Sequence, residues 1–161
     1  MNDLLANASP GQIECRHRIA DLEASLRKEI AEGRMEQEFH DGTTPEGDQE
    51  AQHHFAQGVY VRSMWLPAGR IIVGRMHLQS RVCIVSAGRC RWIDEFNPEP
   101  VEVQAPWVGE FKAGSKTVVV AVEDTYWSAI TGTDLDEPME ILRTLSVLDV
   151  KEYRQLLEVK S

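Results

Sequence analysis

Short β-strand patterns run from Phe55 to Thr131, and they constrain the fold more than any other feature of the sequence. β-branched and aromatic residues recur in segments that Gly or Pro separates from one another. Because no helical pattern interrupts this run, we expect a mainly β fold, an antiparallel barrel or sandwich. Turns are expected at Asn97–Pro100 and at Gly114. The expected strands are Gly58–Leu66, Arg70–Leu78, Arg81–Val85, Arg89–Phe96, Val101–Trp107, Thr117–Asp124 and 125–131.

A helix is expected near each end of the chain. Ser9 suits an N-cap and Gly33 suits a C-terminal stop, which predicts a helix over residues 9–33. The helix either packs on its own barrel or pairs with the same helix of another copy as a short coiled coil. A final helix is expected over Asp149–Ser161. One narrow apolar stripe marks the first helix, made by Cys15, Ile19, Leu22, Leu26 and Ile30.

These patterns divide the chain into three segments. Residues 1–52 hold the N-terminal helix and an acidic linker that begins at residue 34 and shows no period. Residues 53–134 form the barrel, and residues 135–161 form a C-terminal helical segment.

Composition and charge exclude several classes of protein. The formal net charge of −9 argues against nucleic-acid binding. No apolar run reaches the roughly 20 residues that a membrane helix needs, and the first residues lack the pattern of a signal peptide. Three cysteines without regular spacing favour reduced thiols and a cytoplasmic protein. Cys83 lies in an apolar strand, where a buried structural thiol is expected.

Five residues have the spacing of a known motif: Gly69, Arg75, His77, Arg81 and Gly88. This spacing resembles the first motif of the cupins, which reads glycine, five residues, histidine, one residue, histidine, three residues, glutamate, six residues, glycine. The resemblance covers about residues 55 to 132 and implies a cupin-like antiparallel β-barrel, the double-stranded β-helix or jelly roll. Segments such as the one before Gly69 are also similar to cupin-like proteins encoded by bacteriophages.

The chain departs from the cupin pattern at the positions that hold a divalent metal. Arg75 and Arg81 replace a histidine and the glutamate, and only His77 matches a ligand. In the second motif Gly114 remains, while Thr117 stands at the histidine position and Ala121 at the asparagine position. Since guanidinium groups donate hydrogen bonds and cannot bind a cation, the resemblance implies a pocket that has exchanged its metal for positive charge. No cofactor is implied.

The preferred hypothesis is a non-enzymatic protein that binds a small anionic ligand, either phosphate- or nucleotide-like or a carboxylate. Sequestering a signalling molecule in the cytoplasm of a phage-infected host is one such role, and it rests on the resemblance to phage proteins. If the cupin register holds, the ligand-binding residues converge in the barrel mouth. They are Arg62, Arg75, His77, Arg81 and Thr117.

Three alternatives stay open at this level. In the first, the arginines serve structure only: Arg75 pairs with Glu110 or Glu123, and Arg81 reaches water at a strand end. In the second, the protein is a metal-dependent cupin enzyme, an isomerase or dioxygenase, that uses His77 together with ligands such as His53 or His54. In the third, the barrel is a scaffold and the helices make the contacts.

A homodimer or higher homo-oligomer is expected, because a lone amphipathic helix and an open sheet edge both gain from a second copy. This expectation places Leu22 and Leu26 in a helix contact between subunits.

Overall fold

Two five-stranded antiparallel sheets form the body of the protein. The structure, a computed structural model, describes residues 3–35 and 51–160. Sheet A has the order β1 (Ala51–Ala56), β2 (Val59–Leu66), β9 (Thr125–Gly132), β4 (Arg81–Ala87) and β7 (Trp107–Phe111). Sheet B has the order β10 (Ser146–Val147), β3 (Ile71–His77), β8 (Lys116–Ala121), β5 (Arg89–Asp94) and β6 (Asn97–Gln104).

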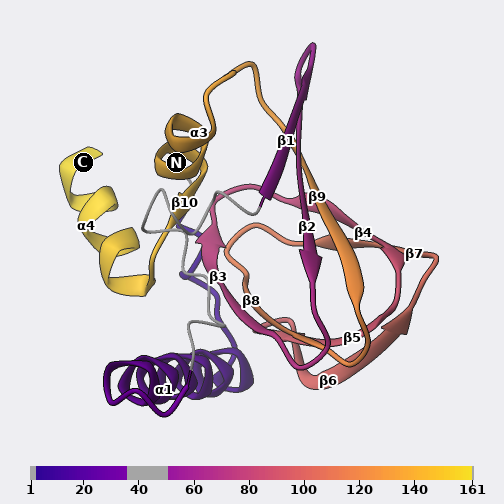
Figure 1. Ribbon diagram of the computed structural model, residues 1–161. Helices are drawn as coiled ribbons and strands as arrows, with labels where there is room; N and C mark the ends of the chain where they lie inside the picture. The colour runs from indigo at the N-terminus through magenta and orange to yellow at the C-terminus, as the bar shows by residue number, and fades with distance from the viewer. Residues whose placement is uncertain (1–2, 36–50, 161) are drawn as a thin grey trace.

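The chain crosses repeatedly between the two sheets, as Figure 1 shows, and this connectivity makes a jelly roll. Helix α1 (Pro10–Ala31) precedes the barrel, and α3 (Pro138–Leu145) and α4 (Val150–Lys160) follow it. The expected fold class, a mainly β jelly roll with helices at both ends, is therefore confirmed. Among the described residues, no helix is long and apolar enough to cross a membrane.

Apolar side chains fill the space between the sheets. The alternation of each strand sends every second side chain inward, and these side chains form one cluster with a set of large rings at its centre. Trp92 lies with its ring centroid 4.6 Å from that of Phe111, and Phe111 lies 5.9 Å from Trp127. Trp65 is the exception among the tryptophans, because its side chain is half exposed on the outer face of sheet A.

Helix α1 packs on the outer face of sheet B. Ser9 caps it, accepting a hydrogen bond from the backbone N–H of Gln12, as its sequence predicts. The apolar stripe, including the buried Ile19 and Leu26, lies against Val73 and Val118 of the sheet. The interpretation of a helix packed on its own barrel is confirmed, because that barrel covers the stripe proposed as a coiled-coil seam.

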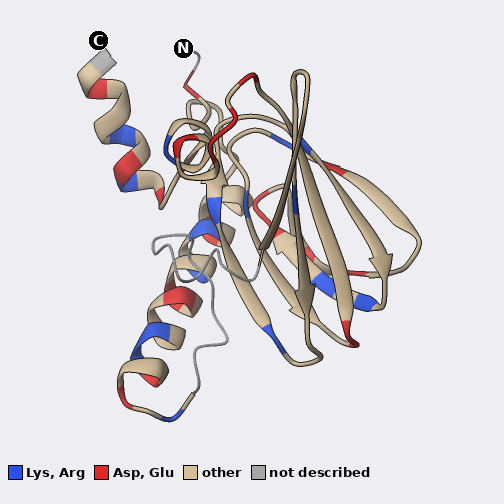
Figure 2. Cartoon of the chain, turned by 45° about the horizontal axis from the view of Figure 1, so that its top comes forward, with Lys and Arg blue, Asp and Glu red and all other residues tan. Residues whose placement is uncertain are grey.

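A buried ion pair fixes α1 further. The ammonium group of Lys116, on β8, contacts the carboxylate of Glu23 and donates a hydrogen bond of 2.7 Å to the carbonyl oxygen of Leu148. This contact joins α1, sheet B and the segment that leads into α4. Figure 2 shows charged residues closely spaced along α1 and α4 and sparse on the strands.

The predicted strand boundaries need three corrections. Residues Asn97–Pro100, expected as a turn, begin β6, because the turn lies earlier, where the Asp94 carboxylate accepts hydrogen bonds from the N–H groups of Phe96 and Asn97. Prolines are tolerated there because β6 is an edge strand. Residues 107–111, expected to lead into a turn, form β7, the edge of sheet A.

The third correction concerns the boundaries of the barrel. Residues 51 and 52, assigned to the linker, belong to β1, which pairs with β2. The rest of the expected linker lies mostly outside the described residues. Residues 146 and 147 add the short strand β10 to sheet B beside β3. Neither strand has a clear sequence pattern: β1 is almost wholly exposed and β10 has only two residues.

Candidate functional site

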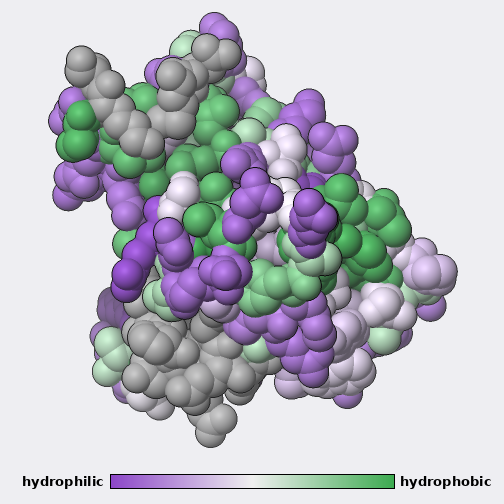
Figure 3. Space-filling model, turned by 90° about the horizontal axis from the view of Figure 1, so that it is seen from above, coloured by the Kyte–Doolittle hydropathy of each residue, from purple (hydrophilic) through white to green (hydrophobic). Residues whose placement is uncertain are grey.

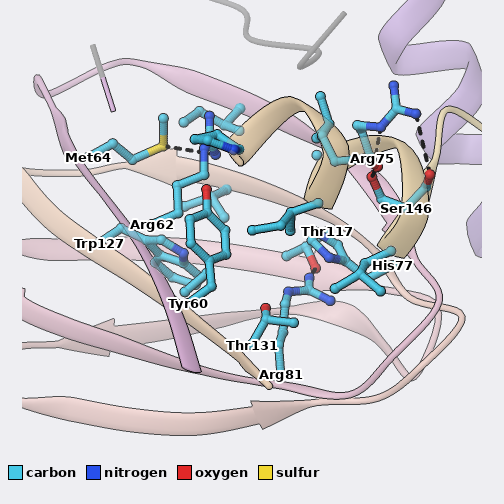
Figure 4. A pocket seen from close by; sticks show the side chains of 18 of the residues that line it. Tyr60, Arg62, Met64, Arg75, His77, Arg81, Thr117, Trp127, Thr131 and Ser146 are labelled. Carbon is cyan, nitrogen blue, oxygen red and sulfur yellow. Dashed lines mark hydrogen bonds between the residues drawn. The ribbon is translucent and has the colours of Figure 1, made fainter. Parts of the chain in front are cut away.

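A pocket of about 130 Å³ opens between the two sheets beneath α3. All five residues predicted to bind a ligand line it, and Figure 4 shows them together with neighbours from both sheets. They are Arg62, Arg75, His77, Arg81 and Thr117. The structure thus brings these five side chains together at one pocket.

An irregularity in β3 places two of these residues. Its pairing with β8 shifts register between Val73 and Met76. Val73 and Met76 both lie on the outer side, against α1 and against the C-terminal cluster respectively. Arg75 and His77 therefore both line the pocket. Strand alternation predicts this, because residues two positions apart in a strand point to the same side.

The two motif glycines that flank these residues have a backbone role. Gly69 and Gly88 adopt φ angles of +87° and +76°, a region that residues with a side chain rarely adopt. At Gly88 there is also no space, since a Cβ atom would lie 2.0 Å from the carbonyl oxygen of Asp124. The chain has kept the turns of the motif while its ligand positions differ.

Arg81 is a buried cation with neutral partners. Its side chain donates hydrogen bonds to the Ser115 hydroxyl at 3.2 Å and the Thr117 hydroxyl at 2.8 Å. Its guanidinium carbon lies 5.1 Å from the centre of the Phe111 ring. Within the described part of the chain, no carboxylate oxygen lies within 4.0 Å of it. Burial lowers the pKa of Arg81, but a guanidinium stays protonated in proteins.

The exposure of Arg81 corrects one structural alternative. Only 5% of the residue is exposed, so it does not reach water at a strand end.

Cys83 lies two residues further into the barrel, and burial raises the pKa of its thiol to about 11. The predicted burial of the Cys83 thiol is confirmed.

Arg75 has partners other than those expected. Its Nε donates a hydrogen bond of 2.9 Å to the Ser146 hydroxyl, and its terminal nitrogen lies 3.7 Å from a carboxylate oxygen of Glu152. The suggested pairing with Glu123 is wrong, because Glu123 contacts Arg89 instead, and no pairing with Glu110 occurs. Arg75 therefore connects β3 to β10 and α4 at the rim of the pocket.

His77 is held neutral by its surroundings. Burial of the imidazole, followed by the charges of Arg81, Arg62 and Arg75, puts the pKa of His77 well below its usual value of 6.5. A neutral imidazole offers one N–H donor and one acceptor to whatever lies in the pocket.

The donor set does not fit a divalent metal. Arginine replaces two of the positions that would carry ligands, and no group of three His, Cys, Asp or Glu side chains gathers anywhere in the described residues. His53 instead meets the Tyr60 hydroxyl at 2.8 Å, and alternation turns His54 to the opposite face of β1. No catalytic step is derived through a metal here.

Several lining residues were not anticipated. Tyr60, Met64, Trp127 and Thr131 come from β2 and β9, and their alternation with outward residues was the available signal. The apolar residues of α3 gave no such signal, because nothing local in the sequence brings that helix over the pocket. They are Pro138, Ile141, Leu142 and Leu145.

Fold and site together define a jelly roll with a cationic, partly apolar pocket. No known family model and no curated protein matches the chain. Among solved structures it is similar to a cupin superfamily protein from Desulfitobacterium hafniense, with 9% identity, a TM-score of 0.45, and 53% and 80% of the respective chains covered. A cupin-2 domain protein from Shewanella frigidimarina shows 11% identity, a TM-score of 0.44, and coverage of 53% and 81%.

A mutant of salicylate 1,2-dioxygenase from Pseudoaminobacter salicylatoxidans is also similar, with 13% identity and a TM-score of 0.46. This similarity covers 51% of the chain but only 25% of the dioxygenase. Likeness at these levels concerns the fold, and function has to be argued from the site.

Proposed function

We propose that this protein binds a small anionic ligand in its barrel and holds it without transforming it. The observation that carries the proposal is Arg81, a buried guanidinium with no carboxylate oxygen within 4.0 Å in the described residues. Asp94 and Glu95 act on its charge only from a greater distance. Removing an ion from water costs several kcal/mol unless an opposite charge offsets it. An anion in the pocket supplies that charge.

The rest of the pocket suits the same kind of ligand. Arg62 and Arg75 add positive potential, and Thr117 and the neutral His77 add hydrogen-bonding groups beside Arg81. Guanidinium is the side chain best matched to carboxylate and phosphate, because its planar fork donates to two oxygens at once. Sequestration of a signalling molecule, in the cytoplasm of a phage-infected host, is the role we attach to this binding; it rests on the sequence resemblance alone.

Calorimetry and thermal unfolding with a panel of phosphates, nucleotides and carboxylates test the proposal. A bound anion should raise the free energy of unfolding by about 2.7 kcal/mol at one hundred times its Kd. The variant Arg81→Gln should lose that effect. The matched control is Arg91→Gln, since the Arg91 side chain is 59% exposed and pairs with Glu102 on the surface.

Two results would contradict the proposal: no anion binds, or binding is unchanged in Arg81→Gln. A biological effect that persists in the double variant Arg75→Ala/Arg81→Ala would favour the scaffold alternative, in which the helices make the contacts.

A further inference from the structure

We infer that the ligand is a compact monocarboxylate with a short apolar body. This inference rests on the proposed function and names the ligand class for the same pocket. Three properties of the site lead to it: its size, the distribution of polar groups along its length, and the number and direction of its free hydrogen-bond donors.

The size of the pocket limits the ligand. Its volume is about 130 Å³, close to that of an engineered protein cavity of about 150 Å³ that binds benzene. A ligand of roughly benzene size therefore fills it. A nucleotide, with a base, a ribose and a phosphate group, is several times larger and does not fit beneath α3.

Polarity changes along the barrel axis. Tyr60 pairs with Thr131, and Val82 pairs with Ile130. Arg81 precedes Val82 on an antiparallel strand, so it lies beside Thr131, and all three residues are at the same level, near the mouth. Four residues further along the strands, the pairings of Trp127 with Val85 and with Met64 form an apolar level. From sheet B the facing residues at that depth are Ile72 and Val119, which pair with each other and line the pocket.

A ligand that fits this gradient has one charged end and one apolar end. Its carboxylate lies at Arg81 and its apolar body points towards Trp127, as the view into the pocket allows (Figure 4). The apolar residues of α3 also line the pocket. Inorganic phosphate has no apolar part that could lie in the apolar level, so it gains less from this pocket than a carboxylate with a short alkyl chain.

The donors of Arg81 favour a carboxylate as well. Each terminal nitrogen carries two hydrogens, and one from each goes to Ser115 or Thr117. The Cys83 sulfur takes part in one further contact with the guanidinium, which leaves part of its planar fork for a ligand, and a carboxylate is the group that such a fork binds best.

Calorimetry with acetate, propionate and butyrate tests the inference. We expect the affinity to rise about fourfold with each added methylene, which corresponds to about 0.8 kcal/mol per buried CH₂ group. Butyramide, the neutral counterpart of butyrate, should not bind. Inorganic phosphate and adenosine monophosphate should bind at least tenfold more weakly than butyrate.

Variants and spectroscopy complete the test. Arg81→Lys keeps the charge but loses the fork, so butyrate affinity should fall at least tenfold, while Arg91→Lys should leave it unchanged. In the unaltered protein, nuclear Overhauser effects should connect the butyrate methyl group with the Trp127 ring, a measurement that does not depend on any variant folding.

The outcomes separate this inference from the proposed function. Equal affinities for the three carboxylates, or contacts of the methyl group away from Trp127, would overturn the inference. Binding of phosphate or adenosine monophosphate that matches or exceeds that of butyrate and depends on Arg81 would overturn it too, while anion binding itself would stand. Failure of every anion to bind would overturn both.

Discussion

At the scale of single residues, the proposed role of Arg81 predicts a conflict between ligand binding and stability. We expect Arg81→Gln to stabilise the ligand-free protein by about 1–3 kcal/mol, because it removes a buried charge that has no carboxylate within 4.0 Å in the described residues. The glutamine amide can still donate to the hydroxyl of Ser115 or Thr117. Urea unfolding of the two proteins without added anions measures the difference. A clear loss of stability would show that the guanidinium mainly supports the barrel.

His77 predicts a dependence of stability on pH. Its pKa in the folded protein lies well below 6.5, the value in the unfolded chain. The unfolded state therefore binds a proton first as the pH falls, and folding loses stability below about pH 6.5, by about 1.4 kcal/mol per pH unit until the folded pKa is reached. Above pH 6.5 this contribution is fully present.

The variant His77→Gln isolates this effect, because its side chain does not titrate. The difference in unfolding free energy between the two proteins should change with pH between 6.5 and 5 and be constant from pH 7 to 8. Measuring the difference is necessary, since burial raises the pKa of Glu95 and that carboxyl group contributes with the opposite sign at lower pH. A difference that is flat across the whole range would contradict a buried, neutral His77.

At the scale of elements, local patterns predicted most strands but not all of their boundaries. Alternation and turn residues identify β2, β3, β5 and β9, since these strands have one buried face, and β-branched residues identify β8, which is buried on both faces. The start of the edge strand β6 was misplaced because prolines at an edge read as a turn, and β7 was missed as a separate strand. Nothing local distinguishes them from turns; the distinction depends on which strand lies beside them.

The candidate site shows the same limit. Motif spacing and alternation correctly placed Arg75, His77 and Arg81 in one pocket, because both signals lie within one short stretch of sequence, although β3 and β4 belong to different sheets. The partner of Arg75 was missed, since Ser146 lies 71 residues away in the sequence. Coverage by α3 was missed for the same reason. Contacts between distant segments arise from packing, and a single sequence carries no local record of them.

The two motif turns allow a matched comparison. Gly69→Ala should lower the free energy of unfolding by about 1–2 kcal/mol, because a residue with a side chain is strained in this left-handed backbone conformation. No steric cost is added, since the space around Gly69 is open. Gly88→Ala should cost about 3–5 kcal/mol, because its Cβ also meets the backbone of Asp124. Thermal or urea unfolding gives both values. Equal costs would mean that the turn at Gly88 shifts to make room.

At the scale of the whole molecule, the helices leave one face of the barrel uncovered. Helix α1 packs on the outer face of sheet B, with α4 on the same side of the barrel, while sheet A faces away from them (Figure 1). Hydrophobic side chains gather on the barrel surface away from these helices, as Figure 3 shows. The exposed large residues on the outer face of sheet A are Val59, Trp65, Val82 and Val108. Phe55 is exposed too, but it lies on the other face, stacked on Tyr60.

This outer face is also free of charge over most of its width. Alternation in β2, β9 and β4 turns only apolar, tyrosine and serine side chains outward. The net charge of −9 makes the charged parts of the surface repel a second copy. The outer face of sheet A does not contribute to this repulsion. These three strands, each of seven or eight residues, cover roughly 370 Å² before side-chain relief is counted. A standard interface buries roughly 800 Å² on each partner, so the flanking strands β1 and β7 have to contribute to the contact as well.

We therefore expect a homodimer that pairs the outer faces of two copies of sheet A, with the stripe of Leu22 and Leu26 committed to its own barrel. Light scattering at micromolar concentration should give twice the chain mass. The variant Val108→Lys should give monomers, because it buries an unpaired charge in the contact. Val159→Lys, at an 86% exposed position on α4, should leave the dimer intact. A monomeric full-length protein would refute the dimer, and a dimer that survives Val108→Lys would refute this face as its interface.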